Sequence, residues 1–302
     1  MEDIVYRIID QNKELFGDID SVEKINVGFT NTIYIVNDKY VVKICSNIDN
    51  ENSFKKEIEF YKANKDNDLI PKLYCYNIDK EAVPYYYEII EKIEGTSLYN
   101  VWHTFSEEKR EDIIKQLCDA MKMFHNNKGE YYDWSKKTKE LFMERYNKTK
   151  EINYFNKEEQ ELLEKAYSRF DEYLKSDEIV LVHNDLHFDN IFYNEKDGKI
   201  KLIDFERSLY APKDFEFNIL YSMIRKPWKF ASEETEKYTK LEDYENIMKY
   251  IEKYYPELIN IENLYKRLAI YDIVYELKHC YLYPDILETK EMVLEAVNKV
   301  LE

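Results

Sequence analysis

A polar stretch that follows an apolar run holds the residues of this chain best suited to chemistry. The run ends at His183 and Asp185, Asn190 follows five positions after Asp185, and a second apolar run, Ile200–Ile203, ends at Asp204. Phosphoryl transfer needs such a set, because one carboxylate accepts a hydroxyl proton while an amide oxygen and a second carboxylate hold Mg²⁺ against nucleotide phosphates. Each piece alone is common, but the combination is specific.

The same stretch permits a second interpretation, the metal site of a hydrolase, because alternating His and Asp side chains bind Zn²⁺ or Mn²⁺ readily. The ligands would then be His183, Asp185, His187 and Asp189. None of the three histidines outside this stretch lies in an acidic motif that would complete such a site. We therefore favour phosphoryl transfer.

A lysine within an apolar run and a glutamate in the N-terminal region support this choice. Lys43 lies in a β-branched run, 40–44, where a lone ammonium is costly to bury. Glu57 comes 14 positions later, in a segment with helical spacing over 51–63. A lysine paired with such a glutamate can hold nucleotide phosphates, whereas the simpler alternative is a lysine at a sheet edge that reaches solvent.

The elements that must position these residues fall into two regions. Residues 4–16 are predicted to form a short helix, and 21–45, 71–74 and 85–90 alternate as the strands of a small antiparallel sheet. Beyond Gly95 we expect helices over 107–126, 233–255 and 261–283, one or two long charged helices within 136–174, and a small β-rich part at 179–205. The predicted fold class is α+β, with residues 1–94 as an N-terminal lobe and 95–302 as a helical C-terminal lobe.

These motifs and their order resemble the aminoglycoside phosphotransferase family, the small-molecule branch of the protein-kinase-like fold, which also includes choline-type kinases. His183-x-Asp185-x-x-x-x-Asn190 is similar to its catalytic loop, and Ile203-Asp204-Phe205-Glu206 to its metal-binding segment. The resemblance implies that Asp185 is the catalytic base, that Asn190 and Asp204 bind Mg²⁺, and that His183 braces the loop. It also implies that ATP or GTP is the phosphate donor.

The family resemblance extends to two nucleotide-binding segments. A phosphate-covering loop would lie at residues 27–32, where Gly28, Thr30 and Asn31 resemble the short loop of small-molecule kinases, although a plain hairpin turn fits nearly as well. The segment 90–95 resembles the hinge, in which backbone groups at about Glu91 and Ile93 would bind the base. The alternative is an edge strand that ends at a Gly turn. No GxxxxGK[ST] pattern is present, which excludes a P-loop enzyme.

One segment departs from the family pattern. After the metal motif the family usually has G-D-P-x-x-D, whereas this chain has Ala211-Pro212-Lys213-Asp214-Phe215-Glu216. Either Asp214 or Glu216 could take the bracing role of the final acid, and the sequence leaves that choice open.

The composition of the chain limits the classes of molecule that it is expected to bind. The formal net charge is −17, which argues against nucleic acid and anionic membranes and favours a cationic ligand. The four cysteines show no regular spacing, so a disulfide framework and a cysteine-rich zinc site are both unexpected. The N-terminus does not resemble a signal peptide and no apolar run is long enough to span a membrane, so we expect a cytoplasmic protein.

The sequence thus predicts a small-molecule kinase. The expected acceptor is a small, cationic alcohol, with an aminoglycoside antibiotic first and a choline-like or amino-sugar metabolite next. Antibiotic resistance would be the corresponding role, and no protein partner is implied. A non-catalytic kinase-like binding module remains an alternative, but it would need a broken motif, and Lys43, Glu57, Asp185, Asn190 and Asp204 are all intact.

Overall fold

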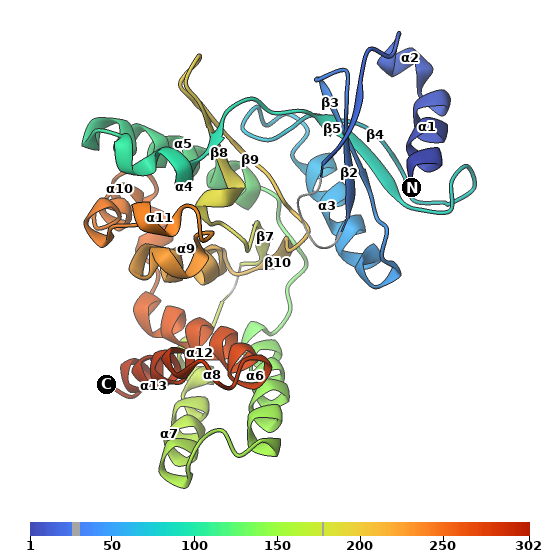
Figure 1. Cartoon of the computed structure of the whole chain (residues 1–302). Coiled ribbons are helices and arrows are strands. Elements are labelled where there is room, and N and C mark those ends of the chain that lie inside the picture. Colours follow the sequence, from blue (N-terminus) through green and yellow to red (C-terminus); the bar gives the residue numbers. More distant parts are fainter. Residues whose placement is uncertain (26–30, 177) are drawn as a thin grey trace. The chain divides into compact units, whose positions relative to one another are not determined.

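The computed structural model describes residues 1–25, 31–176 and 178–302 (Figure 1). The chain divides into two compact units, each built from two stretches of sequence. Residues 1–123 and 188–209 form unit 1, and residues 124–187 and 210–302 form unit 2. Each unit therefore combines two segments that are far apart in the sequence.

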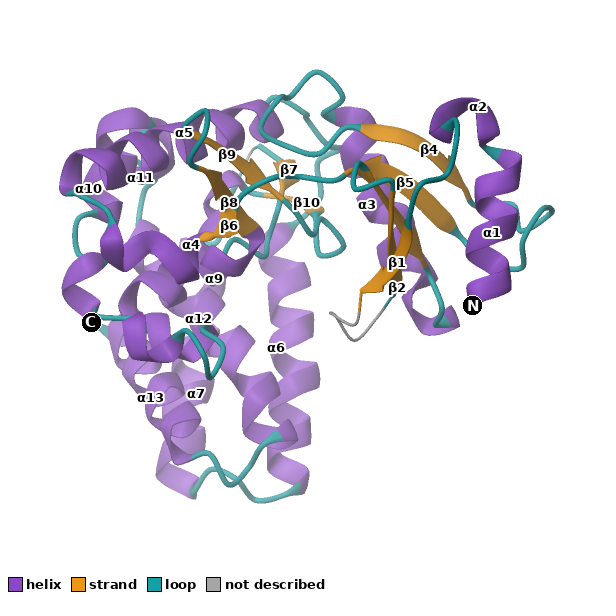
Figure 2. Cartoon of the chain, turned by 45° about the horizontal axis from the view of Figure 1, so that its top comes forward, coloured by secondary structure: helices purple, strands orange, loops and turns teal. Residues whose placement is uncertain are grey.

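Unit 1 contains a five-stranded antiparallel sheet with the strand order β1-β2-β3-β5-β4 (Figure 2). Its strands are β1 (Val22–Ile25), β2 (Thr32–Val36), β3 (Tyr40–Ile44), β4 (Leu73–Asn77) and β5 (Tyr87–Glu91). The β2–β3 connection is a tight turn in which Asn37 and Asp38 both have positive φ, which short polar side chains tolerate. This turn fixes the register that sets the face on which Lys43 lies.

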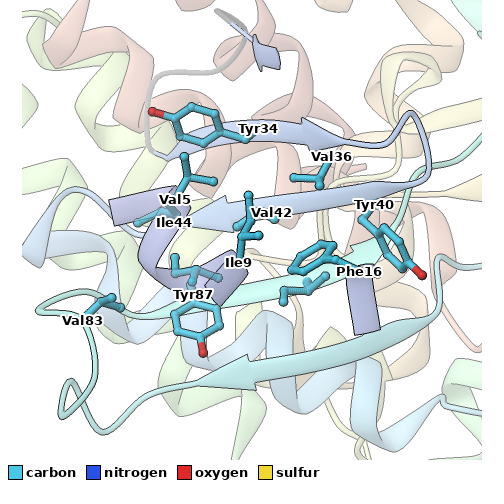
Figure 3. Packing of buried hydrophobic residues seen from close by; sticks show 12 residues of the cluster. Val5, Ile9, Phe16, Tyr34, Val36, Tyr40, Val42, Ile44, Val83 and Tyr87 are labelled. Atoms are coloured by element: carbon cyan, nitrogen blue, oxygen red, sulfur yellow. The ribbon is translucent and has the colours of Figure 1, made fainter. Parts of the chain in front are cut away.

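One face of the sheet packs against the helices α1 (Glu2–Gln11) and α2 (Lys13–Phe16). Val42 and Ile44 of β3 point into this core together with Val5 and Ile9 of α1, and all four are buried (Figure 3). Because successive side chains of a strand alternate between faces, Lys43 must point to the opposite side.

The opposite face is covered in part by α3 (Glu51–Ala63). Phe54 and Ile58 of this helix pack on Cys45 and Tyr86, and all four side chains are buried. Glu57 lies on the same buried stripe of α3. A glutamate on α3 and a lysine on β3 are thereby brought to one side of the sheet.

Unit 1 also contains α4 (Leu98–Val101), most of α5 (Glu107–His125) and a second sheet of β6 (Thr96–Ser97), β8 (Ile191–Asn194) and β9 (Lys199–Leu202). Gly95 precedes β6 with a φ of +123°, and a Cβ atom there would lie 2.6 Å from the carbonyl oxygen of Tyr193. Only glycine fits this close approach of two backbones.

Unit 2 is mainly helical. Its helices are α6 (Trp134–Glu151), α7 (Lys157–Ser168), α8 (Phe170–Tyr173), α9 (Phe217–Arg225), α10 (Ile247–Tyr254), α11 (Pro256–Ile259), α12 (Leu264–Leu282) and α13 (Leu287–Leu301). The short strands β7 (Val180–Val182) and β10 (Leu209–Ala211) pair beside them. Most residues of α12 are buried, and this helix packs against α6 and α13.

The predicted α+β class is confirmed, with a small antiparallel sheet followed by a larger helical part. The predicted helix over 233–255 is wrong for its first half, which forms short 3₁₀ turns at Glu236–Tyr238 and Leu241–Asp243 before α10. The helix predicted over 4–16 is broken into α1 and α2 at Asn12, whose side-chain amide donates to the carbonyl of Ile8. Among the described residues, no helix has the length and apolar character to cross a lipid bilayer.

Candidate active site

Lys43 forms the centre of a buried ion cluster in unit 1. Its ammonium lies 2.5 Å from Oε2 of Glu57 and 2.8 Å from Oε1 of Glu206, which follows β9. Burial acts to lower the pKa of Lys43, but Glu57, Glu206 and Glu88 outweigh it and leave the pKa well above its ordinary value. The lysine is therefore charged, and the predicted Lys43–Glu57 pair is present.

Glu88 is a carboxyl group that the sequence reasoning did not identify. It lies on β5 directly opposite Lys43, its side chain is fully buried, and neither of its oxygens has a hydrogen-bond partner among the described residues. Burial raises the pKa of Glu88 well above its ordinary value, and the neighbouring Glu57 adds to the shift. Burial therefore favours the protonated form of this carboxyl group.

Glu206 is the second functional candidate that sequence reasoning missed as an individual residue. It contacts Lys43 at 2.8 Å and accepts a hydrogen bond from the side-chain amide of Asn31, one of the predicted loop residues. Gly28 and Thr30, the other two predicted residues of that loop, lie outside the described residues. The signal for Glu206 was its place two positions after Asp204 in the metal-binding motif.

The predicted magnesium ligands lie on two chain segments that the backbone joins. The carbonyl of Asn190 accepts a hydrogen bond of 3.0 Å from the N–H of Ile203, which places Asp204 at the next position along. Asp204 has a φ of +65°, a left-handed conformation that is unusual outside glycine. A carboxylate and an amide oxygen suit Mg²⁺, which completes its shell with water and substrate phosphates.

Unit 1 contains a cleft of about 440 Å³ with one charged end and one apolar end. Lys43, Glu57, Asp204 and Glu206 line its charged end. The remainder is mostly aliphatic, with Ile25, Ile33, Ile35, Val41, Ile90, Ile93, Phe192 and Ile203 among the lining residues. An apolar slot that ends in a fixed ammonium has the composition of a site for a flat, phosphate-bearing ligand.

Both predicted hinge residues, Glu91 and Ile93, line this cleft. The N–H of Glu91 donates to the carbonyl of Lys72, and its carboxylate pairs with Lys201 at 2.6 Å. The Glu91 N–H is therefore engaged by the neighbouring strand rather than directed to the cleft.

The predicted catalytic loop lies in unit 2, immediately after β7. His183 is fully buried and Asp185 is 9% exposed, and Asn184 between them has a φ of +62°. A left-handed residue in a buried loop costs free energy that surrounding contacts must offset, and such residues cluster at functional sites.

Glu216 supplies those contacts. Of the two acids that the sequence offered for the bracing role, Asp214 and Glu216, it is the one that contacts the loop. Its carboxylate accepts the backbone N–H groups of His183 and Asn184, each at 3.1 Å, and its Oε2 lies 3.2 Å from Nε2 of His125. The other nitrogen of His125 lies 2.8 Å from the hydroxyl of Tyr255. Glu216 thus braces the loop that carries Asp185.

Asp214, the competing candidate, has a different partner. Its two oxygens accept a pair of hydrogen bonds from the guanidinium of Arg267, both at 2.7 Å, and it also accepts one from the hydroxyl of Tyr271. Such a forked pair fixes α12 to the segment before α9.

The structure therefore brings Lys43, Glu57, Asn31, Glu91, Ile93 and Asp204 together around one cleft, with Asn190 tied to the strand end beside Asp204. His183 and Asp185 belong to the other unit. Among the described residues, no group of three or more His, Cys, Asp or Glu side chains is placed so that it could hold a metal ion.

Comparisons with known proteins show the family and the fold of this chain. The family profile described as "Phosphotransferase enzyme family" matches residues 21–250. A search of curated proteins finds no match. Among solved structures, the gentamicin complex of APH(2")-IIa is similar at 18% identity and a TM-score of 0.65, over 99% of this chain and 95% of that chain.

Two further solved structures show the same fold. The ADP-bound aminoglycoside phosphotransferase APH(2'')-Ib has 18% identity and a TM-score of 0.64, over 98% of this chain and 96% of that chain. The spectinomycin phosphotransferase APH(9)-Ia, with ADP and spectinomycin bound, has 16% identity and a TM-score of 0.60, over 98% of this chain and 97% of that chain.

Proposed function

Because the chain belongs to the phosphotransferase enzyme family, we propose that it transfers the γ-phosphate of ATP or GTP to a hydroxyl group of a small cationic molecule. The observation that carries the proposal is the Lys43 ammonium, fixed between Glu57 and Glu206 at the charged end of an apolar cleft. The base would occupy the aliphatic end and the phosphates would meet Lys43. Catalysis of this kind rests on positioning and charge neutralisation.

In the proposed reaction the oxygen of the acceptor hydroxyl attacks the γ-phosphorus. The bond from that phosphorus to the β–γ bridging oxygen breaks, and the nucleoside diphosphate leaves with the electron pair. Asp185 accepts the hydroxyl proton, and Glu216 and His183 keep its loop in place. Lys43 holds the phosphates of the donor.

Asp204 and Asn190 would hold Mg²⁺ in this mechanism, and the ion would neutralise the negative charge of the phosphates. Their oxygens are the donor types that Mg²⁺ takes, and the Asn190–Ile203 backbone bond keeps the two residues on adjoining segments. A carboxylate at Glu206, two positions on from Asp204, adds a further oxygen donor at the same end of the cleft.

The acceptor is proposed to be an aminoglycoside antibiotic first, and a choline-like or amino-sugar metabolite second. Similar solved structures carry gentamicin, kanamycin with GDP, and streptomycin with ATP. The net charge of −17 adds weaker support, since an acidic surface attracts polycations. Resistance to such antibiotics would then be the biological role.

The test is a nucleotide-consumption assay with ATP and with GTP, against kanamycin, gentamicin, choline and a neutral sugar. The aminoglycosides are expected to be phosphorylated with a single phosphate per reacting hydroxyl, as mass spectrometry would show. The Asp185→Asn protein, which should still bind nucleotide, serves as the control for contaminating kinases. Turnover of the neutral sugar in preference to all cations would contradict the proposed acceptor and leave the phosphotransferase chemistry standing.

Nucleotide binding without turnover of any acceptor would favour the binding-module alternative. Thermal unfolding with Mg²⁺ and nucleotide tests nucleotide binding at an early stage, and the turnover assay then separates the two alternatives. A rise in the unfolding temperature that requires both ligands together is expected of the enzyme.

A further inference from the structure

A second cavity in unit 1, of about 710 Å³, lies beside the nucleotide cleft and has a different chemistry. It is formed by the C-terminal end of α3, the loop from 64 to 72, the start of β4, the end of β5 and Lys201 of β9. Tyr61, Pro71 and Glu91 line both this cavity and the nucleotide cleft. A ligand in the second cavity would therefore contact the wall of the first.

The cavity is basic in a strongly acidic protein. Four lysines line it, Lys62, Lys65, Lys72 and Lys201, against two carboxylates, Asp68 and Glu91. One carboxylate is already neutralised, because Glu91 pairs with Lys201 at 2.6 Å. Within the described part of the chain, the ammonium groups of Lys62, Lys65 and Lys72 have no carboxylate within ion-pair distance. The ammonium of Lys62 lies over the ring of Tyr76, and that of Lys72 lies over the ring of Tyr74.

A buried hydrogen-bond donor on the same wall lacks an acceptor. Asn67 is 4% exposed, and its Oδ1 accepts the N–H of Leu69 at 2.9 Å, which fixes the orientation of the amide. Its Nδ2 has no hydrogen-bond partner among the described residues. A buried donor without an acceptor is costly, so this group favours a ligand that brings acceptor oxygens.

The loop that carries Asn67 is fixed by backbone bonds on both sides. The carbonyl of Leu69 accepts the N–H of Leu202, and the carbonyl of Lys72 accepts the N–H of Glu91. The loop between the two sheets is therefore fixed in place by these backbone bonds. The cavity wall that carries the Asn67 amide is preformed before a ligand binds.

From these observations we propose that the cavity binds a small anionic metabolite through a phosphate or carboxylate group. The ammonium groups of Lys62, Lys65 and Lys72 balance its charge, and the Asn67 amide donates to one of its oxygens. The volume suits a ligand larger than a bare oxyanion, since small-molecule sites typically occupy about 300–1,000 Å³. The proposal concerns a site separate from the phosphate-transfer site and does not depend on the acceptor proposed above.

The experiment is calorimetric titration of the full chain with inorganic phosphate, glucose 6-phosphate, citrate and, as the neutral control, glucose. One anion per chain is expected to bind, and glucose is expected not to bind. Tighter binding of glucose 6-phosphate than of inorganic phosphate would identify a phosphorylated metabolite as the ligand class, and tighter binding of citrate a carboxylate.

Substitutions in the second cavity test whether the anion binds there. Asn67→Asp keeps the acceptor for Leu69 but turns the orphan donor into a negative group, so anion affinity should fall by about tenfold or more. Lys65→Gln, at an exposed position that should not affect folding, should weaken binding by about threefold to tenfold. Lys24→Gln, an exposed lysine on β1, is the matched control and should change nothing.

Lys43→Met separates the two cavities, because phosphate could also occupy the nucleotide cleft. Binding that survives Lys43→Met and is lost in Asn67→Asp supports the proposal. Binding that is lost in Lys43→Met and unchanged in Asn67→Asp and Lys65→Gln would overturn it, as would the absence of binding by every anion.

Discussion

Lys43 faces more buried carboxyl groups than one ammonium can balance. Glu57 and Glu206 contact it, and Glu88 lies opposite on the neighbouring strand with no hydrogen-bond partner of its own among the described residues. Burial raises the pKa of Glu57 to about 7, with Lys43 opposing the shift and Asp204 and Glu206 adding to it. Protonation of Glu88, which burial favours, would reduce this excess of charge.

Glu88→Gln tests that protonation through stability. The folded pKa of Glu88 is raised above its unfolded value, so the unfolded chain releases the proton first as the pH rises. Wild-type stability should therefore fall, relative to the Gln variant, from about pH 4.5 upward until Glu88 ionises in the folded state. The slope should not exceed about 1.4 kcal/mol per pH unit. Urea unfolding between pH 5 and pH 8 measures it.

The matched control for this prediction is Glu23→Gln, an exposed glutamate on β1. Its stability relative to the wild type should not change with pH over the same range. A Glu88→Gln protein whose stability runs parallel to the wild type would show that Glu88 ionises normally.

Asp185→Asn is expected to remove most turnover while leaving nucleotide affinity within about twofold. A positioned general base is typically worth about 10²–10⁴-fold in rate. Steady-state kinetics and nucleotide titration on the same preparation measure the two quantities. A variant that kept turnover within about threefold of the wild type would remove Asp185 from the catalytic role.

Asp204→Ala should abolish the dependence of nucleotide binding on Mg²⁺, whereas Asn190→Ala should weaken it less, because a neutral amide oxygen contributes less charge. Calorimetry of nucleotide binding at several Mg²⁺ concentrations gives the comparison. Retention of the full Mg²⁺ effect in Asp204→Ala would mean that another oxygen, such as that of Glu206, holds the ion.

The main feature at the level of elements is the connection between the loop after β7 and the segment before α9. Glu216 makes it by accepting two backbone N–H groups of the loop, at His183 and Asn184. Asn184 has a left-handed φ, so the loop needs this support to keep its shape.

Glu216→Gln keeps the shape of the side chain but loses its charge, and one of its two acceptor oxygens becomes a donor. We expect kcat to fall by about tenfold or more with little change in the KM for nucleotide, since the residues proposed to bind nucleotide lie in unit 1. Asp214→Asn is the control, because it weakens the pair with Arg267 and lowers stability without touching the loop. Equal effects of both variants on kcat and on the unfolding temperature would show that Glu216 only stabilises the fold.

Sequence patterns predicted the elements with strong periodicity. The region predicted as strands over 21–45 forms β1, β2 and β3, and the helix over 51–63 is confirmed with the expected bounds. The first part of the helix predicted over 233–255 does not form. At its start Oγ1 of Thr235 accepts the N–H of Ser232, which offers the backbone an alternative to helical bonds.

The sequence predicted those residues of the candidate site that belong to recognisable motifs. Lys43 and Glu57 were paired correctly because strand and helix periods fix the faces of their side chains. Glu88 was missed because its position opposite Lys43 depends on the register of two strands that are not consecutive in the chain. The choice of Glu216 over Asp214 depends on which carboxylate reaches the loop, and sequence spacing does not contain that geometry.

For the whole molecule, the formal net charge of −17 has a kinetic consequence. If the acceptor is a polycation, kcat/KM should fall as salt rises, because surface charges are screened beyond about 8 Å at physiological ionic strength. Assays of kanamycin and of a neutral sugar between 20 mM and 500 mM NaCl, about a 25-fold range in screening ions, give the comparison. A kcat/KM for kanamycin that is insensitive to salt would contradict electrostatic attraction of the acceptor.

The interleaving of the two units along the chain constrains how this protein is made by the ribosome. Unit 1 lacks β8 and β9 until residue 202 has been synthesised, although its first stretch ends at residue 123. At about 5–20 residues per second, the early strands therefore wait several seconds for the segment that supplies Asn190 and Asp204. During that interval the cleft lacks the lining residues that this segment provides, namely Phe192, Ile203, Asp204 and Glu206.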